Sequence, residues 1–169
     1  MMRHPTVLES TYEDYGEDNM IRVLPFVIIA IELFVIYKLV KRRPSKRIAF
    51  RWAAATAILA SLLLFWINGA VGIIGDANND MNMLYLSVIV IAFLGSLASG
   101  FKPKWCAWSM VAAAILQTTI AAFAVILRSG IDGPIWPFDL LLLTVFFVLL
   151  WLGAALLFFR AQFDDQNVE

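Results

Sequence analysis

The chain has 169 residues, of which 62% are hydrophobic and 15% are charged. Soluble proteins are roughly half apolar and about 25% charged, so this composition exceeds what a water-soluble core can use and indicates an integral membrane protein. The 13 basic and 13 acidic residues give a net charge of zero, and no folded basic surface that would suggest nucleic-acid binding is evident in the sequence.

Five apolar runs follow one another between Val23 and Phe159, separated by short polar gaps. The spans predicted from them are residues 23–40, 52–75, 81–101, 105–127 and 140–159. The last four contain no charged residue, and each reaches the ~20 residues that a helix needs to cross about 30 Å of hydrocarbon. Because lipid cannot satisfy open backbone groups, the predicted fold class is all-α, a polytopic membrane bundle of five transmembrane helices.

The distribution of charge predicts the orientation of this bundle. Basic residues on one side of the five spans are Lys38, Lys41, Arg42, Arg43, Lys46, Arg47, Arg51, Lys102, Lys104 and Arg160, against Arg3, Arg22 and Arg128 on the other. By the positive-inside rule the side with more basic residues is cytoplasmic, so the amino terminus lies outside and the carboxyl terminus in the cytoplasm. The expected location is the cell inner (plasma) membrane. Residues 1–20 then form an acidic extracytoplasmic tail that we expect to be disordered, residues 21–160 the transmembrane domain, and residues 161–169 a short cytoplasmic tail.

The first run differs from the others because it carries Glu32 near its middle. Its neighbours one helical turn away are all apolar, so no cation of its own helix can pair with it. Side chains expected at a similar depth are Ser61 in the second span and Gln117 and Thr118 in the fourth. Two interpretations stay open: a proton-carrying or ligand-binding acid, and an interhelical hydrogen bond to Gln117 or to a partner subunit, which we prefer.

Small residues predict where membrane helices approach closely, because these helices associate through close backbone contact. The predicted packing positions are Ala57, Ser61, Gly95, Ser96, Ser99, Gly100 and Thr118. The fifth span is bulky nearly all round, which predicts a helix that faces lipid or docks to another protein. Trp151 lies near the middle of this span, where its indole N–H either finds a hydrogen-bond partner or carries a tolerated desolvation cost, and we interpret it as a contact residue.

The segment at residues 68–82 is rich in glycine, asparagine and aspartate. Its candidate outer-loop residues are Asn68, Gly69, Gly72, Gly75, Asp76, Asn78 and Asp80. Asp76, Asn78 and Asp80 imitate the first three ligand positions of a calcium loop, but Met81 stands in place of the required glycine and Ser87 in place of the bidentate glutamate. We therefore interpret the segment as a helix-ending turn whose Asn and Asp side chains cap backbone groups, and predict no metal site.

The connection between the first two spans is strongly basic. Its candidates for contact with lipid headgroups are Lys41, Arg42, Arg43, Lys46 and Arg47. Clusters of this kind also fix orientation without any specific lipid contact, and this second interpretation is the preferred one. His4 is the only histidine and Cys106 the only cysteine, so sites built on several His or Cys side chains are excluded within one chain. We predict no catalytic residue and no cofactor.

These observations predict a non-catalytic integral membrane protein that acts as an accessory or interaction subunit. Glu32 and Gln117 are too few polar groups to line a continuous aqueous path in a monomer. The alternative is a small proton-coupled transporter or channel, in which an oligomer gathers several copies of Glu32 around one pathway. The expected partners are membrane lipids and either other membrane-protein subunits or further copies of this chain, with no nucleic acid.

Overall fold

The computed structural model describes residues 23, 26–38, 41, 45–75, 78–131 and 136–163. Within these residues there are five α-helices and one short 3-10 helix, and no strand. A helix at residues 26–38 is followed by α2 (Lys46–Ala70), η1 (Asp80–Met83), α3 (Leu84–Ala98), α4 (Pro103–Ile126) and α5 (Phe138–Phe163). Four of the helices are long and apolar enough to cross a membrane, which confirms the all-helical, multi-pass class.

The 26–38 helix packs on the outside of α5. Its 13 described residues extend about 20 Å at 1.5 Å per residue, less than the thickness of the hydrocarbon core. The ring centroids of Phe26 and Phe138 lie 6.2 Å apart. Further along, Ile36 occupies the space beside Gly153, where an added Cβ would lie 2.7 Å from Ile36 Cδ1. A fifth transmembrane span at residues 23–40 remains a prediction.

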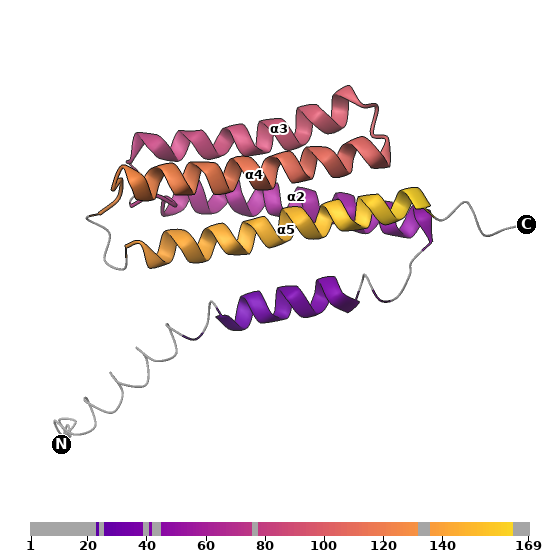
Figure 1. Ribbon diagram of the computed structural model, residues 1–169, viewed down its shortest axis with the longest axis horizontal. Coiled ribbons are helices and arrows are strands. Elements are labelled where there is room, and N and C mark those ends of the chain that lie inside the picture. The colour runs from indigo at the N-terminus through magenta and orange to yellow at the C-terminus, as the bar shows by residue number, and fades with distance from the viewer. Residues whose placement is uncertain are drawn as a thin grey trace, which may run out of the picture.

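Helix α5 is the centre of the bundle, flanked by α4, α2 and the 26–38 helix (Figure 1). In its apolar stretch 50% of the residues are buried, against 22% in α2. Trp151 and Phe147 are fully buried. The expectation that this span faces lipid or another protein is therefore wrong for its buried face, which packs against the other helices. An exposed stripe with Leu141, Val145, Leu152 and Leu156 remains on its other face.

Helices α2 and α3 are consecutive in the chain but touch only lightly, because α2 packs on α5 while α3 packs on α4. A Schellman turn ends α3: Gly100 N–H bonds to Leu97 O at 2.9 Å, Phe101 N–H bonds to Ser96 O at 3.0 Å, and Gly100 has φ +62°. An added Cβ at Gly100 would meet nothing within 4 Å. Gly100 therefore ends a helix and does not serve the close helix packing that was expected of it.

The second helix ends earlier than the predicted span, at Ala70 in place of residue 75. Gly72 has φ +80°, a conformation that costs glycine little, and its N–H bonds to Ile67 O at 3.2 Å. The following residues leave the helix axis, and Ile73 and Ile74 are buried. The glycines thus end α2 and let apolar side chains close one end of the bundle.

Charge is separated between the two ends of the bundle. The start of α2, the α3–α4 turn and the end of α5 lie at the same end (Figure 1). The basic residues of these segments are Lys46, Arg47, Arg51, Lys102, Lys104 and Arg160. Charged residues of the described part at the opposite end are Asp80, Arg128 and Asp139. The end that faces the cytoplasm, and with it the orientation, remains a prediction from the positive-inside rule.

Candidate functional site

Most buried hydroxyl groups of the bundle are satisfied within their own helices. Ser96, Ser109 and Thr144 each donate to the backbone carbonyl oxygen four residues earlier, at 2.8, 3.0 and 2.7 Å. Back-bonding of this kind is common in membrane helices and leaves no donor that requires a ligand. Four side chains keep a buried polar atom without a hydrogen-bond partner among the described residues: Glu32, Asn68, Tyr85 and Gln117. Of these, Glu32 and Gln117 are the ones that the sequence marked as site candidates.

Gln117 of α4 and Trp151 of α5 are both fully buried and joined by one hydrogen bond. Trp151 Nε1 donates to Gln117 Oε1 at 3.2 Å, so the indole has the partner that its position requires. Gln117 Nε2 is buried and has no hydrogen-bond partner in the described part of the chain. The amide therefore links α4 to α5 and makes no bond to Glu32.

Glu32 is 8% exposed, and both of its carboxyl oxygens are buried without a hydrogen-bond partner among the described residues. The hydroxyl groups of Ser61 and Thr118 each donate at 2.9 Å to the carbonyl oxygen four residues earlier in their own helices. Thr118 is exposed on α4, whereas Gln117 faces the core. The structure does not join Glu32, Gln117, Thr118 and Ser61 into one hydrogen-bonded site.

The loop between α2 and α3 is organised by the buried side chain of Asn82. Its Oδ1 accepts from the N–H groups of Ile73 at 3.0 Å and Ile74 at 2.9 Å. Asn68 Nδ2 donates to the carbonyl oxygen of Asn82 at 3.0 Å. These bonds satisfy backbone groups where the chain leaves α2, as the capping interpretation of this segment requires.

The same loop is locked to the α4–α5 loop. Gly75, with φ +74°, lies so close to Gly130 that an added Cβ would be 2.8 Å from Gly130 Cα. Asn79 Nδ2 donates to Ser129 Oγ, and Trp136 Nε1 donates to Ser129 O, each at 3.1 Å. Two loops that are distant in sequence thus form one polar cap over the end of the bundle.

The other predicted outer-loop residues are Gly69, Asp76, Asn78 and Asp80. Gly69 lies within α2, where an added Cβ would meet nothing within 4 Å. Asn78 and Asp80 are exposed, and Asp76 lies outside the described residues. No group of three or more His, Cys, Asp or Glu that could hold a metal occurs among the described residues. The sequence locates a polar turn, but it does not show that Asn79 and Asn82 are the asparagines that turn inward.

The α2–α3 groove is a cavity of about 620 Å³ between those two helices. Ala57 and Ser61 line it from α2, and Ala92 and Ser96 line it from α3. No charged residue lines this groove. Three predicted packing positions, Ala57, Ser61 and Ser96, therefore face a common apolar space between helices.

The remaining packing and headgroup candidates are placed elsewhere. Gly95 brings α3 against α4, since an added Cβ would lie 2.9 Å from Ser109 Cβ. The Ser99 hydroxyl donates to Ser96 O at 2.8 Å. Among the basic residues, Lys41 Nζ lies 5.5 Å from the ring centroid of Tyr37. Lys46 and Arg47 open α2 at the basic end, while Arg42 and Arg43 lie outside the described residues.

No protein-family model, curated protein or solved structure is significantly similar to this chain. Inferences about function therefore depend on the chemistry of the bundle itself. Its distinctive features are the α2–α3 groove, the unpartnered carboxyl group of Glu32 and the polar cap formed by two loops.

Proposed function

We propose that this protein is a non-catalytic subunit of the inner membrane that docks to another membrane protein through the α2–α3 groove. The observation that carries the proposal is the small-residue lining of this groove from two helices that barely touch. Membrane helices associate where small side chains allow backbones to approach. In α3 the small residue Gly95 packs against α4, whereas Ala92 and Ser96 line the inner wall of the groove.

The groove suits an uncharged apolar helix of a partner. Met110 of α4 and Phe158 of α5 are almost completely buried and close its base, so the occupant would contact all four of the long helices. Ser61 and Ser96 already donate within their helices, but their oxygen atoms can still accept a hydrogen bond from a polar side chain of the partner. The absence of charge from the lining favours close van der Waals packing as the main attraction.

Affinity purification in mild detergent with mass spectrometry tests the proposal when groove variants are compared. Ala57→Leu fills the groove, whereas Ala55→Leu adds the same atoms on an exposed face of α2 outside the groove. We expect a heterologous subunit to co-purify with the wild type and with Ala55→Leu and to be lost from Ala57→Leu. A homo-oligomer that breaks up on Ala57→Leu, or a subunit retained by both variants, would contradict the accessory role.

A proton-coupled transporter or channel is the second candidate. It is favoured by the buried carboxyl oxygens of Glu32, which have no hydrogen-bond partner within the described ranges. A carboxyl group exchanges protons, whereas an amide of the same shape does not at physiological pH. Among the described residues, the other ionisable side chains buried in the bundle core are the phenol of Tyr85 and the thiol of Cys106. A pathway would therefore require several chains, each contributing its own Glu32.

Comparison of Glu32→Gln with Glu32→Leu separates the two candidates. For a structural role we expect Glu32→Gln to assemble normally, and Glu32→Leu to weaken assembly by about 1 kcal/mol, the scale of a hydrogen bond between membrane helices. For a transport role, Glu32→Gln must abolish proton flux into liposomes while the protein stays assembled on a native gel. Such a loss of measurable wild-type flux would refute the non-transport assignment.

A further inference from the structure

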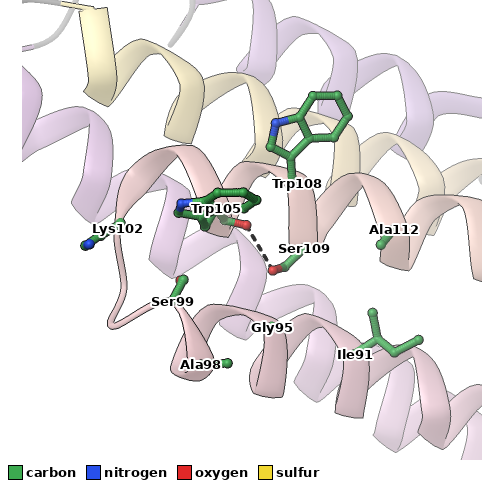
Figure 2. Close-up of a pocket in the computed structure, with 9 residues that line it drawn as sticks. All are labelled: Ile91, Gly95, Ala98, Ser99, Lys102, Trp105, Trp108, Ser109 and Ala112. Atoms are coloured by element: carbon green, nitrogen blue, oxygen red, sulfur yellow. Dashed lines mark hydrogen bonds between the residues drawn. The ribbon is translucent and has the colours of Figure 1, made fainter.

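A crevice of about 620 Å³, distinct from the groove, opens between the last turns of α3 and the first turns of α4. Figure 2 shows Lys102 at one end of it and Ile91 and Ala112 at the other. It lies on a different face of α3 from the α2–α3 groove, because the two cavities share no lining residue. The two cavities also differ in charge, since a lysine lines only the crevice.

The end of the crevice at Lys102 presents donors suited to an anion. Lys102 is exposed, and no acidic residue lies in the first turn of α4. The indole nitrogen of Trp105 lies on the side of its ring nearer to Lys102 (Figure 2). An ammonium group and an N–H donor on neighbouring turns can both bond to the oxygen atoms of one phosphate.

Away from Lys102 the crevice becomes apolar. Gly95 and Ser109 meet at its base, and the Ser109 hydroxyl is already bonded to Trp105 O at 3.0 Å. Ala112 follows Lys102 by ten residues, which corresponds to a depth of about 15 Å at 1.5 Å per residue. This is half of the ~30 Å hydrocarbon core, so the crevice reaches about as deep as one leaflet.

We propose that this crevice binds one phospholipid with an anionic headgroup. The phosphate lies between Lys102 and Trp105, and one acyl chain follows the apolar side chains past Gly95. Charge complementarity identifies the occupant, because basic pockets between membrane helices attract anionic headgroups. The crevice opens at the basic end of the bundle, which carries Lys46, Arg47, Arg51, Lys102, Lys104 and Arg160. An apolar partner helix would leave Lys102 without a counter-charge.

Native mass spectrometry of the full chain, titrated with dioleoylphosphatidylglycerol or dioleoylphosphatidylcholine, tests the site. We expect one saturable site that prefers phosphatidylglycerol. Lys102→Ala should lower the affinity for phosphatidylglycerol about fivefold, which corresponds to the ~1 kcal/mol that a basic residue near the surface contributes. The matched control Lys104→Ala removes the same charge outside the crevice and should change the affinity by no more than about twofold, as expected for an exposed charge without a specific contact.

A second pair of variants tests the part of the crevice proposed to hold the acyl chain. Ala98→Phe narrows the crevice and should weaken binding of phosphatidylglycerol, whereas Leu97→Phe on the neighbouring exposed position, outside the crevice, should leave it unchanged. Equal affinity for the two lipids, equal effects of the two lysine substitutions, or unchanged binding by Ala98→Phe would overturn the proposal. Displacement of the lipid by excess inorganic phosphate would also overturn it, because it would show a simple anion site.

Discussion

The hydrogen bond between Trp151 and Gln117 gives the most direct test of the packing of α5 at the centre of the bundle. Trp151→Phe removes the donor of the 3.2 Å bond and leaves both polar ends of the buried Gln117 amide without a partner. Gln117→Leu removes the acceptor together with the unpartnered Nε2, and leaves one unpaired indole N–H. The double variant has neither unpaired group.

These differences set the expected energies. Trp151→Phe loses a bond, leaves a desolvated amide and opens a small void, so the free energy of unfolding should fall by roughly 2–3 kcal/mol. Gln117→Leu should lower the free energy of unfolding by about 1 kcal/mol, because removal of the unpaired amide nitrogen offsets part of the loss of the hydrogen bond. The double variant should be about 1 kcal/mol more stable than the sum of the two single effects predicts, within the range of roughly 0.6–1.7 kcal/mol known for hydrogen bonds between membrane helices.

Reversible unfolding with sodium dodecyl sulfate in mixed micelles measures these free energies for the four proteins of the cycle. As a control, Gln117→Leu combined with Leu156→Ala, at an exposed position of α5, should show additive effects. A coupling between Trp151 and Gln117 below the ~0.3–0.5 kcal/mol scatter of independent sites would refute the assignment of this bond, and with it the central placement of α5.

Three further predictions concern the glycines and the orientation. Gly75→Ala should destabilise the protein by at least about 1 kcal/mol, because φ is +74° and the new Cβ would press on Gly130. The control Gly69→Ala, inside α2, should be neutral or stabilising. Equal effects of the two substitutions in the same unfolding assay would contradict the contact between the two loops. Gly153→Leu should cost roughly 1–3 kcal/mol through its clash with Ile36, and unchanged stability would show that the 26–38 helix does not pack on α5. A fluorescent protein fused to the carboxyl terminus should fold and fluoresce in the cytoplasm, and an active export-dependent phosphatase at the same point would reverse the predicted orientation.

The sequence by itself determined the class of the protein and the location of its four long helices. Both follow from local quantities: the length of an uncharged apolar run compared with the thickness of a bilayer, and the charge of the gaps between runs. The interpretation of Trp151 as a contact residue also followed from the sequence, because an indole N–H at that depth either finds a partner or costs free energy; that the partner is Gln117 came from the structure. The capping role of the 68–82 segment followed from its Asn, Asp and Gly residues.

Only the tertiary structure decided which faces of these helices meet. In a water-soluble helix the polar residues mark the exposed face, but in a membrane helix the lipid-facing and the buried faces are both apolar. Hence the bulky residues of α5 did not reveal its central position, and small residues did not distinguish a helix contact at Gly95 from an open groove at Ala57 or a turn at Gly100. Likewise, the choice of Asn79 and Asn82 as capping residues depends on segments brought together from distant parts of the chain. The same is true of the environment of Glu32, whose carboxyl oxygens have no partner among the described residues.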